Sequence, residues 1–550
     1  VLGSTIQAAI KRAAPLVERG YRFSYDMLGE AAQTHADAEL YFNRYRDALL
    51  AVGRYDGPIK SESNEALMAR ASLSVKLSAI HPRYEPAKRA QLHKELVPRL
   101  TELAVLAREQ GLGLTVDAEE QSVLDLQLGI FARVMAEPEL AGWSGFGLAV
   151  QAYGRRSVPV LRWLRQLAKR HERRIPVRLV KGAYWDSEIK WAQQMGLEDY
   201  PVFTRKLHTD VSYLACMRLL LSETEVFYPQ FATHNAQTLA TALIAGGDAD
   251  FEFQRLHGMG EALSEDSVER GEFHRPCRIY APVGGHEDLL AYLVRRLLEN
   301  GANTSFVNRI ADEALPIGEI IRDPVETVLN EQEGGVSGEV LVRPPRLFGP
   351  GRRNSEGLAL DETRVRDDLL ASMSETLRTD FSVNPLVGGH PVKGEGQPRL
   401  IQCPHDHRRT MGDVRDATPA IVDLAVGAST AAARAWERRG ADARADMLDQ
   451  TAHLFEQNRG QLMAAIVREA GKTLGNALDD LREAVDFLRY YANEGRRLMA
   501  APLEMPGPTG ETNHLSLLSR GPFACISPWN FPLAIFTGQI AAALATGNPV

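Results

Sequence analysis

The chain has 550 residues, and its 63 lysines and arginines against 71 aspartates and glutamates give a net charge of −8. This length exceeds what one hydrophobic core usually serves, so we expect at least two domains. The acidic balance gives no support to nucleic-acid binding. No apolar run is long enough to span a membrane, so any membrane contact would be peripheral.

Four cysteines are scattered along the chain without CxxC spacing: Cys216, Cys277, Cys403 and Cys525. They predict neither a zinc site nor a disulfide framework, and they indicate a reducing cytoplasm. No signal peptide opens the chain. It starts inside an amphipathic segment and ends after an apolar one, so we expect an internal portion of a longer polypeptide.

Short β-type runs that end in polar residues recur along the first half of the chain. They are FSYDML (23–28), LSVKLSAI (73–80), GLTVDAEE (113–120), FGLAVQAY (146–153), PVRLVKG (176–182), FATHN (231–235), FEFQRL (251–256) and CRIYAPVGG (277–285). Segments of helical period, such as 88–111 and 157–172, lie between them. This alternation predicts a (βα)8 barrel with its active site at the carboxyl ends of the strands. An open doubly wound sheet also alternates, but it more often carries a glycine fingerprint after its first strand, and none follows FSYDML.

The fifth run continues as PVRLVKGAYWDSE (176–188) and places two cations in an apolar strand and its turn. Arg178 and Lys181 are costly to bury without anionic partners. The pattern therefore favours a strand end that faces a bound, electron-rich ligand. The alternative is a solvated strand end, with Tyr184 and Trp185 as core aromatics.

Other strand ends carry further candidate groups. Asp117 is a candidate site acid or hydrogen-bond acceptor, whereas we expect the adjacent Glu119 and Glu120 to face solvent. His234 is a candidate general base or cofactor contact, with a structural histidine as the commoner alternative. No second ligand stands at metal spacing near it, so we expect no metal site.

The segment AYLVRRLLENG (291–301) follows the eighth run. Helical spacing places Tyr292, Arg295, Arg296 and Glu299 on one face. Two adjacent guanidinium groups suit an anion between them, and a carboxylate matches their planar donors. The alternative is a solvated helix edge on which Glu299 pairs with one arginine. The position of this helix over a barrel mouth that also holds Lys76 favours the carboxylate site.

The second half of the chain differs in composition. Residues 311 to about 400 lose periodicity and are rich in proline and glycine, as connectors are. Helical period returns from about Asp413, and glycines 440, 460 and 471 mark expected helix ends. The last piece, 515–550, is interpreted as a buried strand, a turn at SPWNFP (527–532) and a helix.

These motifs resemble a known family. The runs LSVKLSAIHPRYE, LTVDAEEQ, VRLVKGAYWDSEIKWAQ, FATHNAQT, FEFQRLHGMGE and YLVRRLLENGANTSFVN look like the proline dehydrogenase domain of the bifunctional proline utilization (PutA) family, over nearly all of residues 20–310. From about residue 400, VREAGKT and SPWNFP are similar to the aldehyde dehydrogenase superfamily. The resemblance implies a distorted (βα)8 barrel over 1–310, a linker over 311–400 and the N-terminal part of a Rossmann-like α/β aldehyde dehydrogenase domain over 401–550.

The resemblance also implies roles for individual residues. Non-covalent FAD would lie at the carboxyl face of the barrel, against Ala118, Gln151, Lys181, Gly182, Ala183, Trp185, Thr233 and His234. Arg178 would lie near the flavin N5 and N1 edge and raise its electron affinity. Lys76, Arg295 and Arg296 would hold the proline carboxylate, Tyr280 and Tyr292 would pack around the ring, and Asp117 would be the active-site acid.

In the second domain, Asn530 would donate a hydrogen bond to the aldehyde oxygen, and Ile526, Ser527, Pro528 and Trp529 would line the NAD cleft. The superfamily's cysteine nucleophile and glutamate base would lie beyond residue 550. Cys403 and Cys525 do not stand in the nucleophile's sequence context.

The reaction implied is hydride transfer from C5 of L-proline to FAD, which yields pyrroline-5-carboxylate. Electrons would pass to a membrane quinone, so the protein would be cytoplasmic and peripheral to the inner membrane. The longer protein would oxidise glutamate semialdehyde to glutamate with NAD. The oligomeric state stays open, with a homo-oligomer among the alternatives. Two rival classes remain: a barrel aldolase or lyase that uses Lys76 or Lys181 as a Schiff base, and a noncatalytic binding module.

Overall fold

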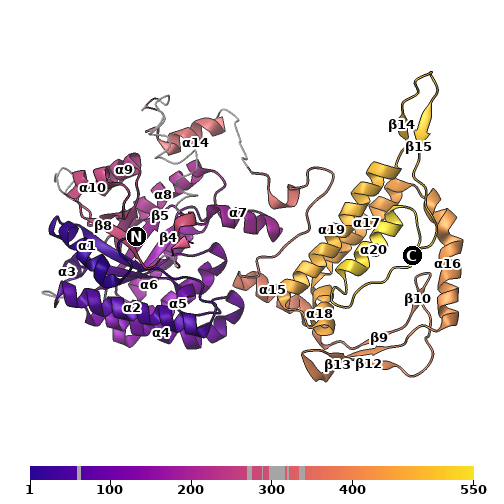
Figure 1. Ribbon diagram of the computed structural model, residues 1–550, viewed down its shortest axis with the longest axis horizontal. Coiled ribbons are helices and arrows are strands. Elements are labelled where there is room, and N and C mark those ends of the chain that lie inside the picture. Colours follow the sequence, from indigo (N-terminus) through magenta and orange to yellow (C-terminus); the bar gives the residue numbers. More distant parts are fainter. Residues whose placement is uncertain are drawn as a thin grey trace. The chain divides into compact units, whose positions relative to one another are not determined.

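The computed structural model describes residues 1–58, 63–268, 275–285, 287, 289–290, 292–295, 316, 318, 321–333 and 341–550. The chain divides into two compact units (Figure 1). Unit 1 comprises residues 1–191 and 200–341, and unit 2 comprises residues 192–199 and 342–550. Each unit is described by itself.

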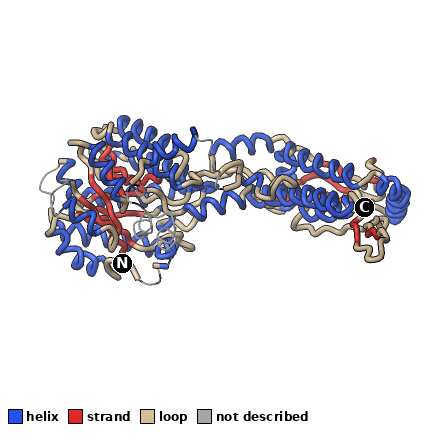
Figure 2. The backbone as a smooth tube through the Cα atoms, turned by 90° about the horizontal axis from the view of Figure 1, so that it is seen from above, coloured by secondary structure: helices blue, strands red, loops and turns tan. Residues whose placement is uncertain are grey.

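Unit 1 contains a closed barrel of eight parallel strands in sequential order, β1 to β8, drawn in red in Figure 2. The strands are β1 (Arg22–Met27), β2 (Ser72–Val75), β3 (Gly113–Val116), β4 (Phe146–Gln151), β5 (Ile175–Val180), β6 (Phe227–Ala232), β7 (Glu252–Leu256) and β8 (Cys277–Val283). Closure comes from pairing of β1 with β8, in which Arg22 is opposite Arg278. Nearly all strand residues are buried, as expected when one face points to the barrel axis and the other to helices. The predicted (βα)8 barrel is confirmed.

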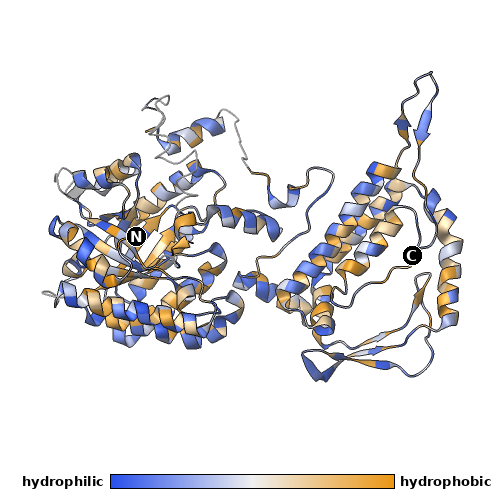
Figure 3. Cartoon of the chain, viewed as in Figure 1, coloured by the Kyte–Doolittle hydropathy of each residue, from blue (hydrophilic) through white to orange (hydrophobic). Residues whose placement is uncertain are grey.

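Helices alternate with the strands of the barrel: α1 precedes β1, and the other helices of unit 1 follow the strands. They are α1 (Ile6–Glu18), α2 (His35–Asp56), α3 (Asn64–Ala69), α4 (Arg89–Glu109), α5 (Leu124–Met135), α6 (Ser157–Arg170), α7 (Trp185–Gln194), α8 (Lys206–Leu221), α9 (Ala236–Gly246), α10 (Glu261–Val268) and α14 (Pro324–Glu333), with short 3-10 turns at Leu77–Ala79, Pro86–Lys88, Gln121–Val123 and Pro138–Leu140. In α6 the buried positions Val160, Leu161, Leu164 and Leu167 recur at helical spacing. Figure 3 shows this alternation of apolar and polar residues along the helices. Among the described residues, no helix is both long and apolar enough to cross a membrane.

Unit 2 is built on helices that pack around the long helix α19. Its helices are α15 (Thr363–Met373), α16 (Pro419–Arg438), α17 (Ala441–Gln457), α18 (Arg459–Ala470), α19 (Leu474–Met499) and α20 (Ala534–Ala545), with 3-10 turns at Pro344–Arg346 and Thr376–Arg378. Its strands are β9 (Phe381–Val383), β10 (Leu386–Val387), β11 (His390–Pro391), β12 (Arg399–Cys403), β13 (Asp406–Val414), β14 (Leu503–Met505) and β15 (Asn513–Leu515). The range expected as a linker, 311–400, contains α15 and β9 to β11 and the first residues of β12. Leu369 and Met373 of α15 join a buried cluster.

Two local predictions in unit 2 are corrected. Gly440 and Gly471 lie at helix ends as predicted, at φ +83° and +65°, but Gly460 lies inside α18. A Cβ atom on Gly460 would come within 2.4 Å of Ser372 Oγ, so glycine permits close packing of α15 on α18. The expected buried strand after residue 515 is also wrong, because Leu518 and Ile526 are 76% and 86% exposed and β15 ends at Leu515.

Candidate active site

The carboxyl mouth of the barrel gathers buried charged groups from five strands. Asp26 lies on β1, Lys76 and Asp117 directly follow β2 and β3, Arg178 lies on β5 and Tyr280 on β8. The four charged residues are at most 6% exposed. Parallel strands in a closed barrel end at one face, which is why residues far apart in sequence meet here.

Asp117 is the hub of this cluster. Its Oδ1 accepts a hydrogen bond from Arg178 Nη1 at 2.6 Å, and its Oδ2 accepts from Lys76 Nζ at 3.1 Å and from the Tyr280 hydroxyl at 2.8 Å. Burial alone would raise the pKa of Asp117, but the charges of Lys76 and Arg178 outweigh it and hold the pKa below its ordinary value. At neutral pH this carboxylate is therefore an acceptor, not a proton donor.

Lys76 is paired twice. Besides Asp117, its ammonium donates to Asp26 Oδ1 at 2.9 Å. Burial would lower the pKa of Lys76, but the charge of Asp26 outweighs burial and holds the pKa well above the ordinary value. The two aspartates take two of the three ammonium hydrogens, which leaves the third suited to another anion.

Arg178 is held on every side of its guanidinium group. Nε donates to Gln254 Oε1 at 2.8 Å, and Nη2 donates to Ser24 and Ser74 at 3.0 and 2.8 Å. The guanidinium carbon lies 4.8 Å from the centroid of the Tyr280 ring. These contacts explain how the sequence accommodates a charged residue in a buried strand.

A third cation, Arg295, lies on the short helical stretch 292–295 with the half-buried Tyr292. Its two Nη atoms lie 2.6 and 2.8 Å from the carboxylate oxygens of Glu30, and its guanidinium lies 5.2 Å from the Tyr184 ring centroid. Burial would lower the pKa of Arg295, yet the Glu30 hydrogen bonds outweigh it and raise the pKa. Arg296 and Glu299, the other predicted members of this face, lie outside the described residues.

The turn after β5 carries three of the predicted flavin residues, Lys181, Gly182 and Ala183. Gly182 has φ +135°, and a Cβ atom there would come within 2.5 Å of the Tyr153 ring, so only glycine fits. Ala183 N donates to Gln151 Oε1 at 3.4 Å, while Gln151 Nε2 donates to the Glu119 carbonyl at 2.9 Å. Lys181 pairs with Asp210 at 2.5 Å, and burial lowers its pKa.

The remaining predicted flavin residues lie at neighbouring strand ends. His234 Nε2 accepts from Leu256 N at 3.0 Å, so its proton is on Nδ1. Thr233 Oγ1 accepts from Asn235 N at 3.1 Å, which shapes the turn after β6. Trp185 Nε1 donates to the Phe203 carbonyl at 2.9 Å, so its polar edge is engaged by the protein. Ala118, next to Asp117, is half-buried.

Glu119 departs from the sequence expectation. Glu120 is exposed as predicted, but Glu119 is 7% exposed and its Oε1 accepts from Ser78 N at 3.1 Å. Burial raises the pKa of Glu119 to about 7. Sequence reasoning missed Glu30, Ser24 and Ser74 as site residues. The two serines lie inside the predicted runs FSYDML and LSVKLSAI, but a serine in a buried strand carries no signal of which face it occupies, and Glu30 lies outside both runs.

In unit 2, Asn530 is exposed. The segment that carries it is held four residues later, where the backbone N–H of Ala534 binds Asp480. Asp480, 1% exposed, accepts from Ala534 N at 2.8 Å and from Lys472 Nζ at 2.9 Å. The Lys472 ammonium also lies 4.2 Å from the Phe531 ring centroid. Of the predicted NAD-cleft residues, Ile526 and Trp529 are 86% and 87% exposed and Ser527 and Pro528 are half-buried; Gln539 Nε2 donates to the Ile526 carbonyl at 2.9 Å.

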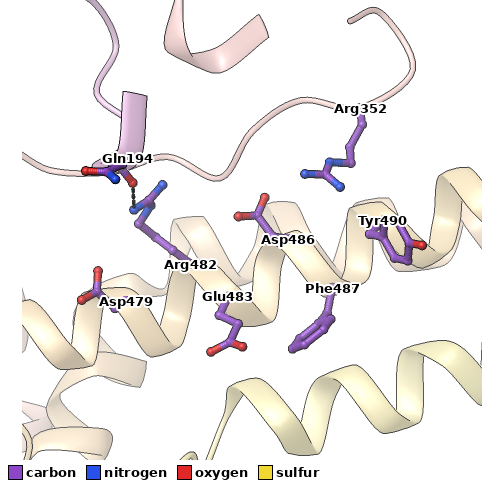
Figure 4. A pocket seen from close by; sticks show the side chains of 8 residues that line it. All are labelled: Gln194, Arg352, Asp479, Arg482, Glu483, Asp486, Phe487 and Tyr490. Carbon is purple, nitrogen blue, oxygen red and sulfur yellow. Dashed lines mark hydrogen bonds between the residues drawn. The ribbon is translucent and has the colours of Figure 1, made fainter. Parts of the chain in front are cut away.

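A hollow of about 510 Å³ also lies along α19 in unit 2 (Figure 4). Its lining mixes two arginines with three carboxylates and two aromatic rings: Gln194, Arg352, Asp479, Arg482, Glu483, Asp486, Phe487 and Tyr490. Arg482 Nη1 donates to the Gln194 carbonyl at 2.8 Å. None of the predicted site residues lines it. Among the described residues, no group of three or more histidine, cysteine or acidic side chains is arranged to hold a metal.

Comparison with known proteins identifies the barrel. The family model described as "Proline dehydrogenase" matches residues 9–309, more than half of the chain. The chain belongs to the proline dehydrogenase family. Residues 392–550 match the model of the aldehyde dehydrogenase family.

Curated relatives of this proline dehydrogenase family member are named as bifunctional proteins. The chain is 47% identical over 561 residues to "Bifunctional protein PutA" of Klebsiella aerogenes, which covers 100% of this chain and 41% of that protein. The chain is also 46% identical over 572 residues to the Rhizobium meliloti protein of the same name. That match covers 100% of this chain and 43% of the Rhizobium meliloti protein. The chain thus spans about two fifths of the length of these curated relatives.

Solved structures agree with both assignments. PutA from Bdellovibrio bacteriovorus inactivated by N-propargylglycine has a TM-score of 0.89 at 30% identity, covering 100% of this chain and 57% of that one. A bifunctional proline utilization A protein has a TM-score of 0.86 at 46% identity, and the match covers 99% of this chain and 52% of that one.

A further sequence match is shorter. The 1-pyrroline-5-carboxylate dehydrogenase of Geobacillus thermodenitrificans is 35% identical over 166 residues, which are 30% of this chain and 32% of that enzyme.

Proposed function

We propose that the barrel oxidises L-proline to pyrroline-5-carboxylate with non-covalently bound FAD. The proposal rests on one observation above all: the buried Lys76, Asp117 and Arg178 form a hydrogen-bonded cluster with the half-buried Tyr280 at the mouth of a proline dehydrogenase family barrel. FAD, when bound at this face, accepts the hydride that leaves C5 of proline.

Binding of the proline carboxylate falls to Lys76, Arg295 and Arg296. Both terminal nitrogens of Arg295 bind the carboxylate of Glu30, which shows that this guanidinium group can bind a carboxylate through two hydrogen bonds. A substrate carboxylate would bind its remaining N–H groups or replace Glu30. Lys76 supplies a further positive charge. Tyr280 and Tyr292 would pack against the pyrrolidine ring, and Asp117 orients Lys76, Arg178 and Tyr280 as one unit.

The flavin side of the mouth suits FAD in its chemistry. Lys181 and Lys206 converge on the single carboxylate of Asp210, at 2.5 and 2.8 Å, so one positive charge remains for a diphosphate. Gln151, Gly182 and Ala183 form a close-packed turn beside it, and Thr233, His234, Trp185 and Ala118 would complete the cofactor's surroundings. Arg178 brings a fixed positive charge to the reacting side and thereby favours the uptake of electrons.

In the longer protein, we propose a second activity that oxidises glutamate semialdehyde to glutamate with NAD. Asn530 would donate a hydrogen bond to the aldehyde oxygen, with Ile526, Ser527, Pro528 and Trp529 at the NAD cleft. The anchoring of this segment through Asp480 supports the role, because an oxyanion donor must be held in place before reaction. The first domain would be 1–310, the connector 311–400 and the second domain 401–550.

We further propose that electrons from the barrel pass to a membrane quinone, with the protein cytoplasmic and in transient contact with the inner membrane. The test is proline-dependent reduction of a soluble quinone analogue by the purified protein, with pyrroline-5-carboxylate as the product. Quinone reduction without proline dependence would contradict the proposal.

The aldolase alternative receives one supporting observation and two opposing ones. A Schiff-base lysine needs a lowered pKa, and burial lowers that of Lys181, whereas the pKa of Lys76 is raised. Lys181 is nevertheless held by Asp210. Borohydride trapping of a carbonyl substrate on Lys181, in a colourless protein, would favour the aldolase.

A further inference from the structure

A column of polar side chains runs inside the barrel from the active-site cluster toward the amino ends of the strands. It consists of Arg178, Gln254, Glu252 and Arg278, each at most 4% exposed. Barrel interiors of this fold are mostly filled by branched aliphatic side chains. A continuous hydrogen-bonded column in such a place needs a reason beyond packing.

Gln254 is the link between the cluster and the rest of the column. Its Oε1 accepts from Arg178 Nε at 2.8 Å, and its Nε2 donates to Glu252 Oε1 at 3.1 Å. A guanidinium group cannot accept a hydrogen bond and an ionised carboxylate cannot donate one. The amide therefore satisfies both neighbours in only one of its two orientations.

Glu252 fixes that orientation because it is itself immobilised. Its carboxylate accepts from Arg278 at 2.6 and 3.0 Å, from Arg22 at 3.0 Å and from Gln230 at 2.8 Å. Burial would raise the pKa of Glu252, but the two arginines outweigh it and lower the pKa, so the group stays ionised. An ionised carboxylate at this point leaves the Gln254 oxygen facing Arg178.

The consequence falls on Arg178. Asp117, Ser24 and Ser74 bind its two terminal nitrogens, and Gln254 alone among the described residues accepts from Nε. Gln254, which accepts from Nε, lies on β7, whereas Ser24 and Ser74 lie on β1 and β2. The guanidinium group is therefore held from two different parts of the barrel wall. It thus fixes the rotation of the guanidinium plane about the Arg178 side-chain axis.

We propose that Gln254, held by Glu252, is a positioning residue that sets the orientation of the Arg178 guanidinium group toward the cofactor. The inference rests on the proposed role of Arg178 in tuning the flavin. Gln254 would act on the flavin only through Arg178. Its loss should therefore alter electron uptake by the flavin and leave the binding of proline unchanged.

The test compares Gln254→Leu with a matched control, Gln230→Leu, in the FAD-loaded protein. Both substitutions remove one buried amide that donates to Glu252 Oε1, and both residues lie near Arg178, since Gln230 is its partner on the neighbouring strand. Only Gln254→Leu removes the acceptor of the Arg178 Nε hydrogen bond. Gln254→Met, which keeps the side-chain length and lacks the acceptor, is measured in parallel in case one variant does not fold. The readouts are the flavin midpoint potential, kcat and KM for proline.

We expect Gln254→Leu and Gln254→Met to lower the midpoint potential, by less than Arg178→Met does. We also expect them to lower kcat several-fold while KM for proline stays within about twofold of the parent value. Gln230→Leu should leave the potential unchanged. Equal shifts in the Gln254 and Gln230 variants would mean a merely structural role and would overturn the inference.

Arg178→Met separates this inference from the proposed function. A lowered potential in Arg178→Met together with an unchanged potential in both Gln254 variants would refute only the positioning role. An unchanged potential in Arg178→Met itself would refute the role of Arg178 on which the inference rests.

Discussion

Glu119 offers a pH-dependent test of how the barrel mouth is built. Burial raises its pKa from 4.5 to about 7 in the folded protein, while the unfolded chain keeps a value near the ordinary one. The folded state therefore holds this proton more tightly than the unfolded state. The contribution of Glu119 to the free energy of unfolding should therefore be most favourable below about pH 4.5, fall as pH rises from about 4.5 to about 7, and stay low above that window.

The perturbation is Glu119→Gln, which keeps an acceptor oxygen for the Ser78 amide at this position. Each unit of pKa difference corresponds to about 1.36 kcal/mol. The raised pKa therefore makes ionised Glu119 destabilising by about 3 kcal/mol above neutral pH. Between about pH 5 and about pH 8, the stability of Glu119→Gln relative to the parent should therefore rise by about 2–3 kcal/mol.

The assay is urea unfolding of the parent and variant proteins at these two pH values, followed by circular dichroism. Glu120→Gln is the matched control, because this neighbouring carboxylate is exposed. It should show no pH-dependent difference from the parent. A stability difference between Glu119→Gln and the parent that is the same at both pH values would refute the reasoning.

Three further substitutions test the site. Arg295→Met should raise KM for proline at least tenfold, since a charge-assisted hydrogen bond contributes about 1.5–3 kcal/mol, while FAD stays bound; steady-state kinetics with an unchanged KM would count against the carboxylate role. Asp117→Asn leaves Arg178 buried without its carboxylate partner, so thermal denaturation should show that the free energy of unfolding falls by about 3 kcal/mol or more. An unchanged stability would contradict the central role of Asp117 in the cluster. Gly182→Ala forces a Cβ atom to within 2.5 Å of the Tyr153 ring, at a position whose φ of +135° disfavours residues other than glycine. The free energy of unfolding should fall by about 1–3 kcal/mol, and less FAD should be retained on gel filtration. Full FAD retention at parental stability would show that glycine is not required in this turn.

The barrel was predictable because each of its strands is a short apolar run closed by a polar residue. Strand β5 (Ile175–Val180), for example, nearly coincides with the expected run 176–182. The amino-acid types at the strand ends also pointed to Lys76, Asp117 and Arg178, because buried cations and carboxylates need one another.

The contacts between those residues were less accessible. Glu30 pairs with Arg295 across 265 residues of sequence, whereas helical spacing suggested a local partner, Glu299. In a parallel barrel both strand faces are buried, so sequence does not reveal that Ser24 and Ser74 face the axis and bind Arg178. The burial of Glu119 likewise depends on the neighbouring 3-10 turn at Leu77–Ala79, not on its own sequence context.

The failed strand after residue 515 has a different cause. Its apolar residues satisfy the composition of a buried strand, but a strand forms only where a neighbour pairs with it. In the described part of unit 2, β15 ends at Leu515 after pairing with β14, and Leu517 and Leu518 beyond it are exposed.

The proposed oxidation of proline is tested most directly by the visible absorption spectrum of the purified protein under anaerobic conditions. The spectrum should show oxidised flavin, and L-proline should bleach it. Proline methyl ester, which lacks the carboxylate that Lys76 and Arg295 are proposed to bind, should bleach it far more slowly. A colourless protein, or a flavin spectrum that L-proline leaves unchanged, would contradict the account.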